Sequence, residues 1–276
     1  MQYRHINYKI NGPIDAFGDD GQVVLHINEN FDFFNPKAGL NWQFCNNHRL
    51  FASFSVAQKE PTRNNYTDRF LTVMPRAERL FDYELGYAYE GKVFDAGMNF
   101  YYMDYDNQLV PTGAYNEVGE AVTENVKNSY RLGVELTAAL HLPCGFNWNA
   151  NAAFSRNRVK MGGHWNHLSF SPNVVLNNVL AYQWHRWDFA LQTQYVGRQY
   201  MSNLDRLAHR LSDYCVSNLS ADYSFNFWRL KGVTVGCTVY NLFNKKYASN
   251  GWASYDDYYD DFFDYEEAED YYYDHG

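Results

Sequence analysis

The stretch "FNWNANAAFSRN", residues 146–157, alternates apolar and polar side chains along most of its length. The even positions are apolar: Phe146, Trp148, Ala150, Ala152 and Phe154. Asparagine fills positions 147, 149 and 151 between them. Because successive side chains of a β-strand point to opposite faces, this period of two predicts a strand with one apolar and one polar face.

The same alternation recurs in "LFDYELGYAYE" (80–90), "VFDAGMNFYY" (93–102) and "NLSADYSFNF" (218–227). No segment of comparable length shows the i, i+3, i+4, i+7 pattern of an amphipathic helix, so helix is expected to be a minor component. The pattern predicts about eleven antiparallel strands in an all-β fold. Their expected ranges are 2–11, 32–44, 48–58, 80–90, 92–105, 127–141, 146–158, 172–184, 186–199, 213–227 and 232–246.

Strand length and connection length favour a transmembrane barrel over a soluble β-sandwich or solenoid, the alternative all-β fold. Soluble strands average about 5–6 residues, whereas a tilted membrane-spanning strand needs about 9–11, and most of these reach that length. Short turns such as "LPCG" (142–145) alternate with long connections, expected at 12–31, 59–79, 106–126, 159–171 and 200–212. Short periplasmic turns and long extracellular loops are typical of an up-and-down outer-membrane barrel. Aromatic residues beside the short turns suit a membrane interface.

Composition excludes several other classes of protein. The net charge of −9 is concentrated in residues 255–276, which hold ten carboxylates and no Lys or Arg; the rest has 22 acidic and 23 basic residues. Such a balance argues against a nucleic-acid partner. No run of 18 apolar residues predicts a membrane helix, and "MQYRHINYKI" has no apolar signal region. The four cysteines form no CxxC pair and are expected to be free.

Chemical motifs of catalysis are absent from the sequence. There is no GxSxG, HExxH, P-loop or dinucleotide-binding fingerprint, so we expect neither an enzyme nor a cofactor. His164 and His167 lie three apart in a predicted loop without a neighbouring Cys or carboxylate, which is too weak a pattern to predict a metal site.

An odd number of strands leaves an open sheet. Single-chain bacterial barrels have even strand numbers, and unpaired backbone groups at two edges are costly in hydrocarbon. Eleven is half of the 22 strands of plugged outer-membrane transporters. The sequence therefore predicts part of a larger barrel.

Six motifs in order resemble the C-terminal half of the barrel of TonB-dependent outer-membrane receptors. They are "FFNPKAGLNW" (33–42), "KEPTRNNYTD" (59–68), "ERLFDYELGYAYEG" (78–91), "YYMDYDNQLVPTGAYNEVGEA" (101–121), "NVKNSYRLGVEL" (125–136) and "YNLFNKKYASNGW" (240–252). The resemblance divides the chain into a barrel half at 1–247 and an acidic Tyr/Asp/Glu-rich extracellular loop or truncated tail at 248–276. No plug domain, TonB box or final strand is expected within it.

That resemblance implies a location in the outer membrane of a diderm bacterium, and energised import of a scarce, large nutrient. A ferric siderophore is the expected cargo; haem, cobalamin and glycans stay open. The implied partners are outer-membrane lipid, a plug domain, the N-terminal barrel half, the TonB energy-coupling complex and a small-molecule ligand such as a metal chelate. A passive porin-like or adhesin-like barrel without energy coupling is the alternative.

Two sets of candidate site residues follow from these expectations. Polar residues on the strands are expected to face the lumen and the plug: Asp82, Glu84, Asn99, Arg131, Glu135, Asn149, Gln192, Gln194 and Asp222. Arg, His, Asn and aromatic residues of the long loops suit an anionic, ring-bearing chelate. These rim candidates are Arg63, Asn64, Tyr66, Arg69, Tyr115, His164, Trp165, His167, Arg198, Tyr200 and Arg206.

Overall fold

A computed structural model of the chain describes residues 1–15, 22–67, 73–115, 121–205 and 209–251. Its strands are β1 (Gln2–Asp15), β2 (Gln22–Asn35), β3 (Lys37–Cys45), β4 (His48–Lys59), β5 (Glu78–Glu90), β6 (Phe94–Tyr115), β7 (Ala121–His141), β8 (Phe146–Met161), β9 (His164–His167), β10 (Val174–Trp184), β11 (Trp187–Val196), β12 (Gln199–Tyr200), β13 (Arg210–Leu211), β14 (Tyr214–Phe227) and β15 (Leu230–Val239). One short helix, α1 (Arg63–Thr67), lies between β4 and β5. The acidic segment from 252 onward lies outside the described residues.

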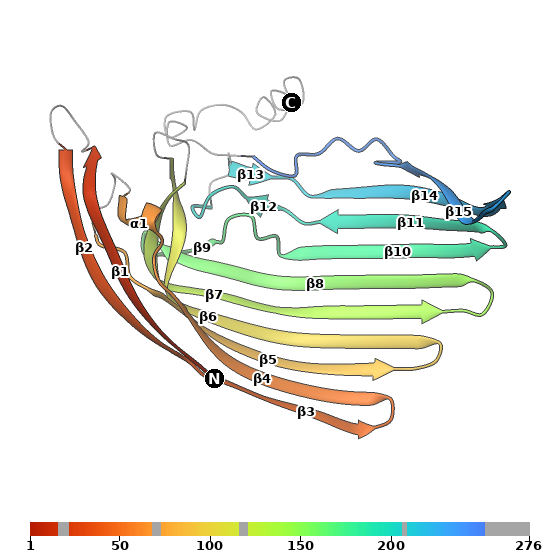
Figure 1. Ribbon diagram of the computed structural model, residues 1–276, viewed down its shortest axis with the longest axis horizontal. Helices are drawn as coiled ribbons and strands as arrows, with labels where there is room; N and C mark the ends of the chain where they lie inside the picture. The colour runs from red at the N-terminus through yellow and green to blue at the C-terminus, as the bar shows by residue number, and fades with distance from the viewer. Residues whose placement is uncertain (16–21, 68–72, 116–120, 206–208, 252–276) are drawn as a thin grey trace.

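The main sheet is antiparallel and follows the chain order (Figure 1). Its strands run β15-β14-β11-β10-β8-β7-β6-β5-β4-β3, with β9 paired to β8. β1 pairs with β2 along its whole length, in a separate two-stranded sheet that leans away from the end of the main one (Figure 1). Strands β3 and β15 are therefore the two edges of the main sheet.

Several strands are continuations of one another across a short break. Pro36 separates β2 from β3, and Pro172 lies in the break between β9 and β10. Proline has no N–H to give to a sheet ladder, so a break at these positions is expected. When β2–β3, β9–β10, β11–β12 and β13–β14 are each counted as one pass, the described chain makes eleven passes. The prediction of an up-and-down antiparallel sheet of about eleven strands is confirmed.

The predicted long loops were wrong in extent. Residues 12–15 and 22–31 of the first predicted loop belong to β1 and β2, and residues 106–115 and 121–126 of another belong to β6 and β7. Beyond the wall both faces of a hairpin meet polar surroundings, so the apolar alternation fades while the backbone ladder continues. The last predicted strand, 232–246, ends at Val239, because Asn241 and Asn244 adopt φ values of 49° and 50° that interrupt an extended strand.

Strand register gives the main sheet one apolar and one polar face. Leu85 lies opposite Ala52 and Phe100, all on one face, whereas Glu84 lies opposite Ser53 and Tyr101 on the other. The apolar face is uncovered: Leu85 is 56% exposed. So large an exposed apolar surface requires a covering partner.

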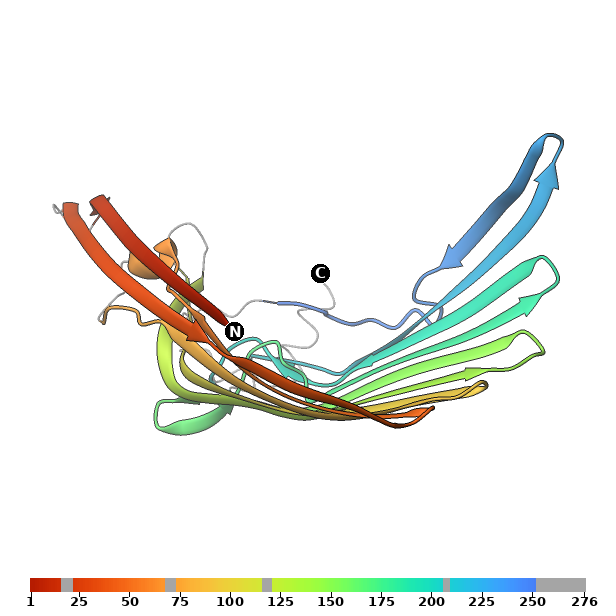
Figure 2. The same cartoon turned by 60° about the horizontal axis from the view of Figure 1, so that its bottom comes forward.

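The sheet is curved, and its polar face is the concave one. After β15 the chain turns back across the hollow side of the sheet (Figure 2). There Tyr240 and Tyr247 line a cavity together with Asn177 and Gln192 of the polar face. The polar face is called the inner face below, and the apolar face the outer face.

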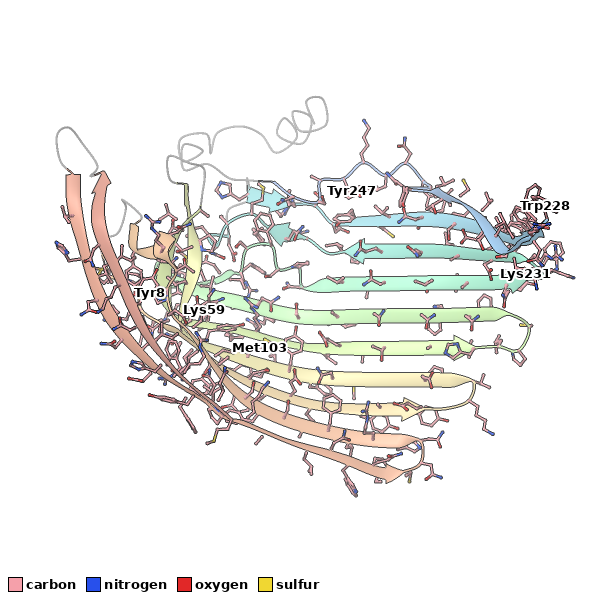
Figure 3. The ribbon with its side chains drawn as sticks, viewed as in Figure 1. Tyr8, Lys59, Met103, Trp228, Lys231 and Tyr247 are labelled. Atoms are coloured by element: carbon pink, nitrogen blue, oxygen red, sulfur yellow. The ribbon has the colours of Figure 1, made fainter. Side chains whose placement is uncertain are left out.

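Aromatic side chains form two belts on the outer face. One lies beside the short turns and includes Trp187 and Tyr223, whose tilted rings have centroids 4.7 Å apart; Figure 3 shows Trp228 at this end of the sheet. The other crosses five strands with ring centroids 5.0–6.3 Å apart. Its members are Phe54, Tyr83, Tyr102, Tyr130 and Trp165. Two aromatic belts flanking an apolar band are the pattern of a strand wall in a bilayer.

Candidate ligand-binding rim and inner wall

The nine predicted lumen-facing residues all lie on the inner face by strand register. In one row Ser55, Asp82, Met103, Arg131 and Asn157 follow each other across five strands. The Arg131 guanidinium lies 5.0 Å from the centre of the Tyr105 ring. Contact of these residues with a plug stays a prediction.

Three of these inner-face side chains have buried polar atoms without a hydrogen-bond partner in the described chain. The atoms are Asp82 Oδ1, Asn99 Oδ1 and Arg131 Nε. A buried polar atom without a partner costs about 1–3 kcal/mol. This part of the wall can therefore gain hydrogen bonds from whatever packs against it.

Helix α1 is fixed by its own asparagine. Asn65 Oδ1 accepts hydrogen bonds from the Thr62 N–H at 2.6 Å and the Thr62 hydroxyl at 2.7 Å, and Asn65 Nδ2 donates to Thr123 Oγ1 of β7 at 2.7 Å. This arrangement turns Tyr66 inward onto Tyr8 of β1, with ring centroids 5.3 Å apart. Arg63 stays exposed, as does Asn64 next to it.

Tyr66 was predicted as a rim residue, but its side chain is only 3% exposed. It therefore packs inside the fold and is not accessible to a ligand at the rim. Its hydroxyl is buried and has no hydrogen-bond partner among the described residues. Burial, with smaller contributions from Glu29 and Tyr8, raises the pKa of Tyr66 to about 12. The sequence could not show this, because the contact with β1 joins residues 58 positions apart.

Replacing Tyr66 with phenylalanine is expected to stabilise the protein by about 1 kcal/mol, because it removes the unsatisfied hydroxyl and keeps the ring stack. The gain should increase above pH 10. An unfolded tyrosine loses its proton near pH 10, whereas folded Tyr66 keeps it up to about pH 12. Between these two pH values, ionisation of Tyr66 favours the unfolded wild type, and the phenylalanine variant lacks this loss of stability. Denaturant unfolding of both proteins at pH 8 and pH 11 checks this; a Tyr66→Phe protein less stable at both would contradict it.

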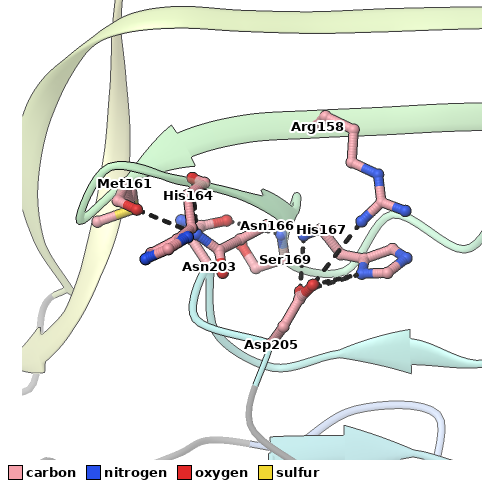
Figure 4. Close-up of polar contacts among 8 residues, drawn as sticks. All are labelled: Arg158, Met161, His164, Asn166, His167, Ser169, Asn203 and Asp205. Carbon is pink, nitrogen blue, oxygen red and sulfur yellow. Dashed lines mark hydrogen bonds and ion pairs between the residues drawn. The ribbon is translucent and has the colours of Figure 1, made fainter.

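The β8–β9 hairpin carries three of the predicted rim residues. His167 is held by Asp205: its N–H donates to Asp205 Oδ1 at 2.7 Å, and its Nδ1 lies 2.9 Å from Oδ2 (Figure 4). Arg158 Nη1 lies 3.7 Å from the same carboxylate. The His167 ring also stacks on Tyr200, with centroids 4.7 Å apart, so two predicted residues from different segments meet. Asp205 was not predicted, and no local pattern marks it.

Trp165 and His164 lie on a strand and not in a loop as predicted. Trp165 is 48% exposed and meets Tyr130 edge-on, so it belongs to an aromatic belt of the outer face. The four-residue ladder of β9 with β8 fixes this orientation. His164 is exposed beside Met161 at the hairpin turn.

The remaining rim candidates do not gather at one point. Arg198 is exposed in the break between β11 and β12, and Tyr115 is the last residue of β6. Arg69 and Arg206 lie outside the described residues. Among the described rim candidates, His167 and Tyr200 come from different segments and are in ring contact.

Asparagine side chains hold the rim segments to the wall. Asn203, 1% exposed, donates from Nδ2 to the Pro111 carbonyl of β6 and accepts from the Ser169 N–H, both at 2.7 Å. Asn125 of β7 binds Arg76 through both the backbone N–H and the carbonyl of that residue. A buried cluster joins residues of β6, β7 and β8 with Leu168: Val110, Val126, Val159, Met161 and Leu168. The rim segments are therefore fixed to the strands by side-chain hydrogen bonds and by apolar packing.

Sequence reasoning missed a cavity of about 580 Å³ on the inner face of β10, β11 and β14. Its lining includes Tyr240, Asn241 and Tyr247 from the segment after β15. Only Gln192 and Gln194 of its lining were predicted as inner-face residues. The signal available was the pair of glutamines at alternate positions of β11, Gln192 and Gln194.

Within the described residues there is no group of three or more His, Cys, Asp or Glu side chains that could hold a metal ion. All four cysteines are free and exposed. No helix there is both long and apolar enough to cross a membrane.

An antiparallel wall with an apolar, belted outer face and a polar, concave inner face defines a segment of a transmembrane β-barrel. The family model "TonB dependent receptor-like, beta-barrel" matches residues 3–242. The chain belongs to this family.

Similar proteins point the same way. The ferric enterobactin receptor of Pseudomonas aeruginosa is 28% identical over 193 residues, which cover 62% of this chain and 25% of that protein. Among solved structures, the ferric-catecholate import receptor Fiu from E. coli K12 superposes with a TM-score of 0.66 at 15% identity, covering 90% of this chain and 38% of Fiu. The ferric yersiniabactin uptake receptor FyuA from Yersinia pestis gives 0.63 at 18%, covering 84% and 36%. The chain thus spans a quarter to two fifths of these relatives, and the structural likeness shows the fold.

Proposed function

We propose that this chain is part of the wall and rim of a TonB-dependent receptor in the outer membrane of a Gram-negative bacterium, and that the receptor imports a ferric siderophore. The observation that carries the proposal is the family match over 3–242 together with the sequence relationship to a ferric enterobactin receptor. It is a transport role and not an enzymatic one.

The open edges at β3 and β15 support the completion of the barrel by further strands. Unpaired edge groups are costly in hydrocarbon, and a further barrel half would pair them. A plug domain would dock on the inner face, where Asp82, Asn99 and Arg131 present atoms that lack partners in the described chain. Hydrogen bonds of this kind contribute about 0.5–1.5 kcal/mol net each, so such a plug could be remodelled without unfolding the wall.

Exposed Arg63, Arg198 and His164 at the rim supply candidate contacts for an anionic chelate. Cationic and aromatic side chains together attract a negatively charged ligand that carries rings. The rim ties through Asn203 and Asn125 would keep these groups in place while a ligand binds.

Growth under iron restriction tests the proposal. A strain lacking the gene is supplied in turn with a ferric catecholate siderophore, haem, cobalamin and neutral glycans, with the gene restored on a plasmid as the control. We expect loss of growth on the ferric siderophore, restored by the plasmid only when TonB is present. Unchanged growth on every source would overturn the siderophore proposal, and uptake that persists without TonB would indicate a passive pore.

A further inference from the structure

The sequence contains the dipeptide Asn-Gly twice: Asn11 and Gly12 lie on β1, and Asn250 and Gly251 follow β15. An asparagine side-chain amide is most easily attacked by the next backbone nitrogen when glycine follows, because glycine has no Cβ to hinder the approach. The two sites share this local chemistry. Any difference in reactivity between them therefore comes from the fold.

The backbone nitrogen of Gly251 already lies beside the Asn250 side chain. Asn250 is exposed and lies outside the strands. The Gly251 N–H donates to Asn250 Oδ1 at 2.9 Å, and the Asn250 side chain forms no other hydrogen bond within the described residues. The carbon bonded to that oxygen, Cγ, is the atom that the nitrogen would attack. Little motion is needed to bring the two atoms together.

The Asn11 site is held in a strand ladder instead. Asn11 and Gly12 pair with His26 and Leu25 in the antiparallel β1–β2 sheet, and Asn11 Oδ1 lies 3.1 Å from His26 Nδ1. In an extended strand the side chain points to one face of the sheet, while the next backbone nitrogen lies within the ladder. This segment must leave its partner strand before the same two atoms can meet.

We propose that Asn250 is a site of spontaneous deamidation, at which the side-chain amide becomes a carboxylate through a cyclic imide. The Gly251 nitrogen gives its proton to hydroxide and attacks Asn250 Cγ. The new C–N bond forms, the Cγ–Nδ2 bond breaks, and ammonia leaves after taking a proton from water. Water then opens the imide at either carbonyl and gives aspartate or isoaspartate. Water is the only co-reactant.

The conversion changes both charge and backbone at this point of the chain. A neutral amide becomes a carboxylate, and in isoaspartate the main chain gains a methylene group. Gly251 is closely packed, because a Cβ built on it would lie 2.6 Å from Met201 Sδ. We therefore expect isoaspartate formation to move Gly251 away from Met201. The site lies outside the strands of the wall, and the inference does not depend on the proposed import of a ferric chelate.

Peptide mass spectrometry tests the proposal on the purified protein, expressed from its complete coding sequence and incubated at pH 7 and pH 9. We expect the mass gain of an NH₂-to-OH exchange at Asn250, faster at pH 9 because the attacking nitrogen must lose its proton. Asn11 in the folded protein should convert about tenfold more slowly, since its strand pairing has to open first. In denaturant the two sites should convert at similar rates, because both are then exposed Asn-Gly pairs.

Two variants separate the chemistry from the fold. Asn250→Gln keeps an amide but would have to close a larger, less favoured ring, so this peptide should keep its mass. Gly251→Ala places a methyl group beside the attacking nitrogen and should slow the conversion. The flexible, unbranched side chain of Met201 can move aside for that methyl group.

Three results would overturn the inference. In the first, Asn11 converts as fast as Asn250 in the folded protein. In the second, folded Asn250 stays intact over a time in which it converts in denaturant. In the third, Gly251→Ala leaves the rate unchanged, which would exclude attack by that nitrogen.

Discussion

Replacing Leu136 with arginine is expected to destabilise the protein by about 2–4 kcal/mol in a bilayer, the cost of a cation at the midplane of a barrel wall. Leu136 lies on the outer face of β7, opposite Met98 of β6 and Ala152 of β8, and is 38% exposed. It stands between the two aromatic belts, where no water is available to solvate a guanidinium. Denaturant unfolding of the protein folded into lipid bilayers measures the difference.

The neighbouring residue is the matched control. Glu135 lies on the inner face, opposite Asn99, and is exposed. Arginine there meets the lumen, so Glu135→Arg should change stability by only about 0.5 kcal/mol. In a soluble β-sheet protein, a partly exposed Leu136 would tolerate arginine almost as well as Glu135 does. Equal effects of the two substitutions would therefore contradict a lipid-facing outer surface.

The strands of the wall could be predicted from the sequence because one face of the sheet contacts lipid and the other contacts the aqueous lumen. Between lipid and lumen, each strand must alternate, and so "FNWNANAAFSRN" already assigns Trp148 to the outer face and Asn149 to the inner one. Above the wall that constraint ends. β6 continues through "DNQLVPTGAY" (106–115), paired with β7 and packed through Val110, and the sequence there was predicted to be a loop.

The rim was less predictable because its geometry comes from contacts between distant residues. Tyr66 is buried only because α1 folds back onto β1, and Trp165 faces outward only because β9 forms four pairs with β8. Neither contact leaves a local pattern. Residue type suggested ligand binding for both, whereas tertiary packing accounts for their positions.

The inner cavity shows the same limit. Two of its amides, Gln192 and Gln194, alternate on β11 and were predicted as inner-face residues. Its cover depends on the backbone reversal at Asn241, where a positive φ ends the extended path and sends Tyr247 over Tyr214. Asparagine tolerates this conformation better than most residues, but "YNLFNKKY" alone does not say which strand the chain will cross.

Replacing Asn203 with alanine is expected to cost about 2–4 kcal/mol of stability, because two backbone groups lose their partner at once. The Pro111 carbonyl on β6 and the Ser169 N–H beside the β8–β9 hairpin are joined through this one amide, which is almost fully buried. Hydrogen exchange should speed up most at Ser169 and in residues 164–168, with a smaller change at the turn end of the sheet.

Asn128→Ala serves as the control, since Asn128 is exposed on β7 and its side chain forms no hydrogen bond in the described chain. Its effect should be about 0.5 kcal/mol or less. A rim that depends on Asn203 would also lose the His167–Asp205 contact in the variant, because Asp205 follows Asn203 by two residues. Unfolding and hydrogen exchange that match those of Asn128→Ala would mean that the buried valine cluster holds the rim hairpins without the asparagine tie.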